Sequence, residues 1–145
     1  MRFWLGAVLS IILLAGNAYA EMVSVTTNQA KILSDPSMGA SYVITRAPLY
    51  FPLNVLGEKD GFYRVSDFMN KIGWVSKTSV DNTRAVIVRT DTANVRQEPT
   101  TQSPIVFRAE EGVTFKVLGE TGHWFSVIHE NGMTGWIYKD LVWGE

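Results

Sequence analysis

The two histidines are the first candidates for chemistry, because an imidazole can act as a base or bind a metal. His123 and His129 lie six residues apart, on or beside one expected strand, and the chain has no third histidine. A metal site would therefore need carboxylates from elsewhere, such as Glu130. We interpret both histidines as surface residues and expect no metal site.

The carboxylates offer no better candidate for acid–base catalysis. Asp35 and Glu98 each precede a proline, where we expect them to shape a loop. Glu110 and Glu111 are adjacent, so on a strand they would point to opposite faces, and in a turn they would be solvated. The chain has no cysteine, and it lacks the motifs of serine hydrolases, phosphate-binding loops and zinc proteases. We therefore expect a non-catalytic protein without a cofactor.

Short strands must position these residues. In the second half, β-branched and aromatic residues gather at 86–90, 94–96, 105–108, 113–118, 124–129 and 134–138. No segment has a sustained helical period. Turn residues stand between these runs, at 97–104, 110–112, 119–122 and 130–132, and residues 139–141 suit one 3₁₀ turn. About five short strands in each unit indicate an all-β fold, as a small barrel or sandwich.

The two halves of the chain repeat one another. When Val25 is placed on Val88, matching residues follow in order, with one residue dropped near 44–46. Residues 55–58 then fall on 117–120 and residues 73–75 on 135–137. This series predicts a duplicated unit of about 55 to 60 residues. We expect a first domain over residues 21–80, a linker over 81–85 and a second domain over 86–145. Because the linker is not rich in glycine or serine, the domains should lie close together.

Several runs in the second unit carry a family resemblance: Ala93-Asn94-Val95-Arg96 with Pro99, Val113 to Glu120, Trp124-Phe125-Ser126-Val127 and Gly135-Trp136-Ile137. Together they resemble the bacterial SH3 (SH3b) domain family over nearly all of residues 86–142. The first unit, residues 25–80, departs more from the pattern and is assigned through the repeat. The resemblance implies two tandem SH3-like β-barrels of about five strands each. It also implies recognition of peptides, proteins or cell-wall polymers without catalysis.

The resemblance further implies where a ligand binds. Eukaryotic SH3 domains hold proline-rich peptides in a shallow aromatic groove. Trp124 matches the groove tryptophan, with Phe62 at that position in the first unit. Tyr138 and Leu141 match the groove proline and tyrosine positions, where the first unit has serines. We therefore expect the second unit to hold the main ligand-binding surface.

Other large side chains are expected to form the core. These are Phe115, Val117, Phe125, Val127 and Ile137. Trp136 lies on the opposite face of its strand from Ile137, so it can be a ligand platform or can cover the barrel edge or the other domain. For Trp124 and Tyr138, a ligand site and an interdomain contact are alternative interpretations.

The N-terminal residues are typical of a secretory signal peptide. Arg2 is followed by an apolar run over residues 3–15 and by Ala18-Tyr19-Ala20. The run has 13 residues, whereas a membrane-spanning helix needs about 20. We expect cleavage after Ala20 and a periplasmic or secreted protein with no membrane span.

The charge balance limits the partners further. After Arg2 the chain carries 12 basic and 14 acidic residues, which does not suggest a nucleic-acid binder. Residues 22–80 carry six basic and four acidic side chains, and residues 86–145 carry five and eight. We expect an exported adaptor that binds peptidoglycan or an envelope protein or peptide. The alternative is a structural subunit of an envelope or extracellular assembly.

Overall fold

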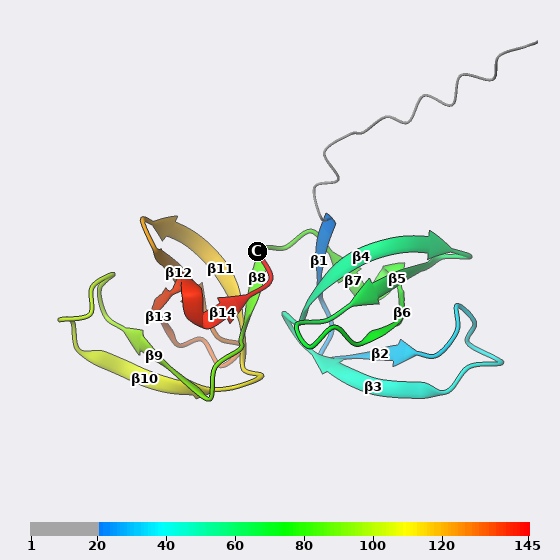
Figure 1. The fold of residues 1–145 in the computed structure, drawn as a ribbon, viewed down its shortest axis with the longest axis horizontal. Helices are drawn as coiled ribbons and strands as arrows, with labels where there is room; N and C mark the ends of the chain where they lie inside the picture. The colour runs from blue at the N-terminus through cyan, green and yellow to red at the C-terminus, as the bar shows by residue number, and fades with distance from the viewer. Residues whose placement is uncertain (1–20) are drawn as a thin grey trace, which may run out of the picture.

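A computed structural model describes residues 21–145 (Figure 1), and the expected signal peptide, residues 1–20, lies outside the described residues. The described part is all-β apart from two single 3₁₀ turns, η1 (Lys77–Ser79) and η2 (Lys139–Leu141). The predicted all-β class is therefore confirmed. Within residues 21–145, no helix has the length and apolar character needed to cross a membrane.

The strands form two antiparallel sheets of seven strands each. The first sheet has the order β3-β2-β6-β5-β4-β1-β7 and contains β1 (Glu21–Val25), β2 (Gln29–Leu33), β3 (Val43–Pro48), β4 (Pro52–Lys59), β5 (Phe62–Ser66), β6 (Ile72–Ser76) and β7 (Val80–Asp81). The second has the order β10-β9-β13-β12-β11-β8-β14 and contains β8 (Ala85–Val88), β9 (Thr92–Arg96), β10 (Ile105–Glu110), β11 (Thr114–Thr121), β12 (Trp124–Ile128), β13 (Thr134–Tyr138) and β14 (Val142–Trp143). The two sheets therefore have the same strand order, because each strand number in the second order is seven higher than its counterpart in the first.

The strand pairing does not close either sheet into the expected barrel, and it gives seven strands where about five were expected. Strands β3 and β7 lie at the two ends of the first order, as β10 and β14 do in the second. A further short strand arises because a 3₁₀ turn redirects the chain after β6 and after β13. The residues that follow each turn then pair with β1 or with β8.

A β-bulge bends the longest strand of each sheet. The register of β11 against β12 shifts between Val117 and Gly119, and β4 shifts at the corresponding place against β5. The extra residue in β11 is Leu118, which is 52% exposed. Because a bulge lets a strand bend without ending, β11 continues to Thr121. The expected turn over residues 119–122 is therefore wrong in extent.

Each sheet has its own core on its inner face. The predicted core residues of the second half are all buried in one cluster, which confirms that prediction: Phe115, Val117, Phe125, Val127 and Ile137. A separate cluster lies in the first sheet, formed by Val23, Val25, Ala30, Ile32, Ala47, Leu53, Val65, Val75 and Val80. Side chains that alternate with these along the strands point outward.

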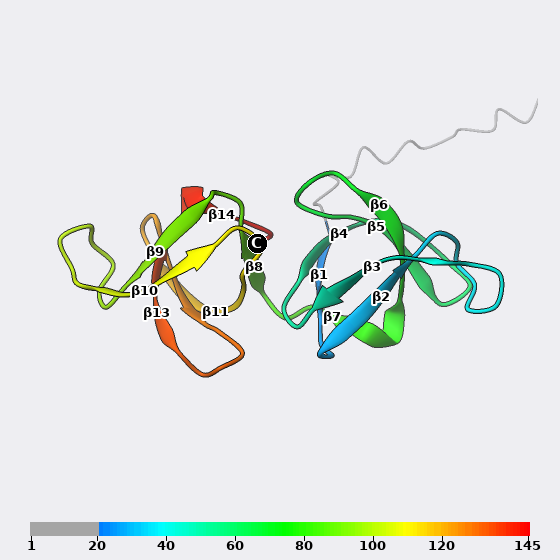
Figure 2. The same cartoon turned by 90° about the horizontal axis from the view of Figure 1, so that it is seen from below.

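The two sheets lie side by side and contact one another near β8 (Figure 1). Strand β8 is buried along its whole length; alternate residues enter the second core, while Ile87 lies opposite Thr114 of β11. The Thr114 hydroxyl donates a hydrogen bond of 2.7 Å to the backbone oxygen of Leu49 in the first half. Only residues 82–84, fewer than the expected 81–85, lie between β7 and β8. The short connection keeps β8 close to the first sheet (Figure 2).

Candidate functional site

An aromatic pair lies on the outer face of the second sheet. Trp124, the first residue of β12, is the cross-strand partner of Tyr138, the last residue of β13. The ring centroids are 5.3 Å apart and the ring planes meet at 72°, which is an edge-to-face geometry. Both side chains are partly exposed, whereas the next residue inward on each strand, Phe125 or Ile137, is buried. Two of the predicted ligand-binding residues therefore share one accessible surface.

Trp136 extends this surface along β13. It stands two residues before Tyr138, so both side chains point to the same face of the sheet. Its cross-strand partners are Ser126 on β12 and Arg96 on β9, and its side chain is partly exposed. We call Trp124, Trp136 and Tyr138 the aromatic surface.

The two other predicted ligand-binding residues lie elsewhere. Leu141 belongs to η2, and its side chain packs against the core of the second sheet. Phe62, the counterpart of Trp124, faces Ser76 across the strands and is only 8% exposed. A phenyl ring has no polar atom to keep in water, so burial is its favoured state. The structure thus buries Phe62 and packs the partly buried Leu141 against the core.

Two arginines that the sequence reasoning did not single out fix the borders of the aromatic surface. Arg89 donates from Nε and Nη2 to the backbone oxygen of Asp140, at 3.1 and 2.9 Å, and so holds η2 beside Tyr138. Arg96 donates from Nη1 to the backbone oxygen of Ser103 at 2.8 Å, which ties down the 97–104 loop. Arg96 closes the Ala-Asn-Val-Arg run of the sequence, but only the fold shows which carbonyl it reaches.

A small charge network lies next to the ring of Phe125, near the ends of β11 and β13. Lys139 follows Tyr138 and places its Nζ 2.8 Å from Oε2 of Glu120 and 4.9 Å from the centroid of the Phe125 ring. The hydrogen bond and the charge of Lys139, with a smaller contribution from Arg84, hold the pKa of Glu120 below its usual value. The network therefore pairs the carboxylate of Glu120 with the ammonium group of Lys139.

The two histidines belong to different surroundings. The His123 ring centroid lies 6.1 Å from that of Tyr138. The His129 ring packs edge-on against Phe115 at 5.8 Å, and its Nδ1 accepts a 3.1 Å hydrogen bond from the backbone N–H of Asn131. In the part of the chain that the structure describes, no three His, Cys, Asp or Glu side chains come together in a way that could hold a metal ion.

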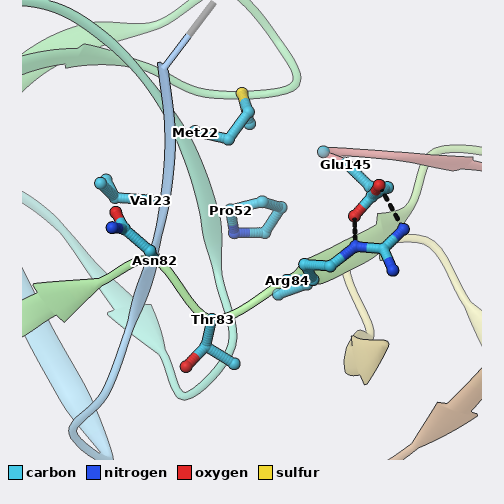
Figure 3. Close-up of a pocket in the computed structure, with 9 residues that line it drawn as sticks. Met22, Val23, Pro52, Asn82, Thr83, Arg84 and Glu145 are labelled. Atoms are coloured by element: carbon cyan, nitrogen blue, oxygen red, sulfur yellow. Dashed lines mark hydrogen bonds and ion pairs between the residues drawn. The ribbon is translucent and has the colours of Figure 1, made fainter. Parts of the chain in front are cut away.

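A cavity of about 210 Å³ lies between the two sheets (Figure 3). Met22 and Pro52 line it from the first sheet, and Gly144 lines it from the second half. Arg84 donates from two nitrogens to the carboxylate of Glu145, so the charged groups of the cavity are paired with each other. A Cβ atom on Gly144 would lie only 2.7 Å from the Cβ of Pro52. We assign this cavity to the packing between the sheets.

A larger groove, of about 420 Å³, lies on the second sheet. We call it the β10 groove, and its lining residues are Phe107, Arg108, Ala109, Glu110, Val113, His129, Asn131 and Met133. The 129–133 turn joins the end of β12 to the start of β13. The β10 groove therefore lies at the opposite end of these two strands from Trp124 and Tyr138.

The region that holds both surfaces matches a known family. The sequence model described as the bacterial SH3 domain matches residues 89–144. Residues 89–144 are therefore similar to bacterial SH3 domains, and we refer to this segment below as the SH3 domain. The resemblance inferred from the sequence motifs of the second half is thereby confirmed. The SH3 domain match begins just after β8 and includes all strands from β9 to β14.

Three solved structures are similar to the chain. NlpC2 from Trichomonas vaginalis has 18% identity and a TM-score of 0.39, with 87% of this chain and 48% of that one covered. NlpC1 from Trichomonas vaginalis has 21% identity and a TM-score of 0.38, with 94% of this chain and 51% of that one covered. An NlpC/P60 family protein from Bacillus cereus has 14% identity and a TM-score of 0.39, with 84% of this chain and 55% of that one covered. The chain spans about half the length of these three proteins. No curated protein matches the chain in sequence.

Proposed function

We propose that this chain is an exported, non-catalytic binding protein whose SH3 domain recognises peptidoglycan, or an envelope peptide, through the aromatic surface. The Trp124–Tyr138 pair carries the proposal, because both rings are partly exposed while the strands below them are packed into a core. Aromatic rings held in this way can stack on sugar rings or apolar peptide groups and lose little conformational entropy on binding.

The first sheet is proposed to be a second SH3-like domain that arose by duplication, with both sheets curved as SH3-like barrels that stay open between their end strands. The identical strand order of the two sheets supports this proposal. The corresponding bulges in β4 and β11 support it as well. In the first sheet a buried phenyl ring and a serine replace the exposed Trp124–Tyr138 pair. The first domain would therefore orient the second rather than bind the same ligand.

Export rests on the signal-peptide pattern of residues 1–20. In the proposed mature chain, cleaved after Ala20, both sheets are retained, because β1 begins at Glu21. N-terminal sequencing of the chain recovered from the cell envelope tests this step directly. A chain that begins at Met1 and remains in the cytoplasm would contradict export.

Co-sedimentation with purified peptidoglycan sacculi tests the binding proposal. Residues 21–145 should pellet with sacculi at low salt, and soluble wall fragments should compete. Failure to pellet would contradict peptidoglycan as the ligand and leave the envelope peptide, to be sought by pull-down from envelope extract. Hydrolysis of wall fragments by the pure protein would contradict the non-catalytic role.

A further inference from the structure

A second space lies between the two sheets, next to the cavity of Figure 3. It is a groove of about 440 Å³ and shares Met22, Gly144 and Glu145 with that cavity. We call it the inter-sheet groove, and its lining residues are Met22, Asn54, Val142, Trp143, Gly144 and Glu145. Binding sites for small molecules are commonly pockets of about 300–1,000 Å³, often at a boundary between domains. The inter-sheet groove has that size and that place.

An aromatic ring lines the second-sheet side of the groove. Trp143 pairs with Ile87 of β8, and its side chain is partly exposed. Its neighbour Val142 is buried in the core of the second sheet, so the indole of Trp143 points to the outer face. The first sheet has the exposed residue Asp81 at the same place in its last strand. The strand therefore forms without a ring at this position, and the indole is available for another role.

An amide lines the first-sheet side of the groove. Asn54 of β4 lies opposite Met22 of β1, and the next residue, on each strand, Leu53 or Val23, is buried in the core. Asn54 and Met22 therefore both point outward. The Oδ1 atom of Asn54 is buried and accepts no hydrogen bond from any group of residues 21–145. Because an unpaired buried oxygen destabilises the fold, its retention points to a polar partner that is not part of the chain.

The charge of the lining limits the chemistry of that partner. Glu145 is the one charged side chain among the residues that line the groove. Its carboxylate accepts hydrogen bonds from two nitrogens of Arg84, so its charge is already paired. A charged ligand would lose its hydration in the groove without gaining an opposite charge. The lining therefore favours a neutral, polar ligand.

We propose that the inter-sheet groove binds a neutral oligosaccharide, with a sugar ring against Trp143 and a hydroxyl or acetamido group on Asn54. A sugar ring has an apolar face that packs on an indole, and its polar groups can pair with an amide, which offers both a donor and an acceptor. An added peptide strand is disfavoured, because β14 has only two residues and so offers little open edge. This site goes beyond the aromatic surface, which contains neither Asn54 nor Trp143.

An NMR titration of residues 21–145 tests the proposal. The probes are chitotriose and cellotriose, two neutral trisaccharides with and without acetamido groups. At least one of them should shift the indole N–H signal of Trp143 and the side-chain amide signal of Asn54 saturably, with a Kd of about 1 mM or lower. The indole signals of Trp124 and Trp136 should stay in place.

Three outcomes of the titration would overturn the proposal. The first is that neither trisaccharide shifts the signals of Trp143 and Asn54. The second is that the shifts occur at Trp124 or Trp136 instead, which would place the sugar on the aromatic surface. The third is that an uncharged tripeptide of alanine, blocked at both ends, shifts the Trp143 signal as strongly as the sugars do.

Variants of the two groove residues separate binding from packing. Asn54→Leu keeps the approximate shape and removes the unpaired oxygen, so the melting temperature should be unchanged or higher, while sugar binding weakens by about fivefold or more. Trp143→Ala should weaken sugar binding by about tenfold or more, and Trp143→Phe, which keeps a ring, should lie between this variant and the parent. Trp136→Ala, the matched control on the aromatic surface, should bind the sugar as the parent does.

Folding controls and a second binding assay keep these outcomes interpretable. Circular dichroism and thermal unfolding are measured for every variant, and if Trp143→Ala does not fold, Asn54→Leu and Trp143→Phe decide the matter. Folded Asn54→Leu that binds the sugar like the parent would overturn the role of the amide. Sacculus binding by Trp124→Ala is measured separately, so failure of the groove and failure of the aromatic surface remain distinguishable.

Discussion

Trp124 and Tyr138 lie directly opposite each other on β12 and β13, with their ring planes at 72° and their centroids 5.3 Å apart. Each ring limits the rotamers of the other, and the bonds of Arg89 to the oxygen of Asp140 hold the turn that follows Tyr138. The pair is therefore ordered before a ligand arrives. Preorganised rings of this kind bind with little further loss of entropy.

We predict that Trp124→Ala and Tyr138→Ala each weaken binding to sacculi by about tenfold or more, because each removes one ring of the pair. Both side chains are partly exposed, so the folded state should persist. The matched control is Leu118→Ala, which removes an exposed apolar side chain from the same sheet. Its binding isotherm should match that of the parent. Equal losses in all three variants would contradict the assignment of the aromatic surface.

Phe62→Ala should behave differently from Trp124→Ala. The Phe62 side chain is 8% exposed, and truncation of a buried phenylalanine costs about 3–5 kcal/mol of unfolding free energy. The loss should be seen in urea-induced unfolding. The binding of variant molecules that remain folded should be unchanged. Specific loss of binding by a fully stable variant would return Phe62 to the ligand surface.

Local sequence predicted the strands of the SH3 domain closely but not every side-chain direction. Residues 134–138 and 139–141 form the expected strand and 3₁₀ turn, because their β-branched, aromatic and turn residues act locally. Leu141 faces the core instead of the groove. When a strand or turn is displaced by one residue, its side chains point to the opposite face. Neither the bulge at Leu118 nor the short strand after η2 can be predicted from composition.

The contacts between the sheets also could not be predicted from local sequence patterns. The short connection indicated that the two halves lie close together, but the pairing of Thr114 with Leu49 joins residues 65 positions apart. The β10 groove likewise depends on Val113 standing where the first half has Phe51. Periodicity treats both as apolar residues, although the difference in their volume decides whether the surface is closed or open.

Gly135→Ala should destabilise the SH3 domain by about 1–3 kcal/mol. A Cβ atom at this position would lie 2.5 Å from Cγ1 of Val95 and 2.9 Å from the backbone oxygen of Arg96, so β9 would have to move away from β13. Gly119→Ala is the matched control, since nothing lies within 4 Å of its added Cβ. Urea-induced unfolding measures both. A Gly135→Ala variant as stable as the control would contradict this tight strand packing.

Thr114→Val should weaken the packing between the two sheets. The substitution keeps the shape of a buried side chain but leaves the backbone oxygen of Leu49 without its donor, which costs about 1–3 kcal/mol. Thr134→Val, at an exposed position of β13, should have little effect. The parent should unfold in one transition, and Thr114→Val should separate it into two. An unchanged midpoint would show that this hydrogen bond does not couple the sheets.

The carboxyl group of Glu120 should titrate below the usual range for glutamate in an NMR experiment. The hydrogen bond and charge of Lys139 lower its pKa, and Arg84 adds a smaller effect. Because the folded-state pKa is depressed, the stabilisation is present above the pKa of the unfolded chain and is lost as the pH falls through the folded value. Lys139→Met should raise the pKa of Glu120 more than Arg84→Met does, and added salt should reduce the difference. A larger rise with Arg84→Met would reverse the assignment of the dominant partner.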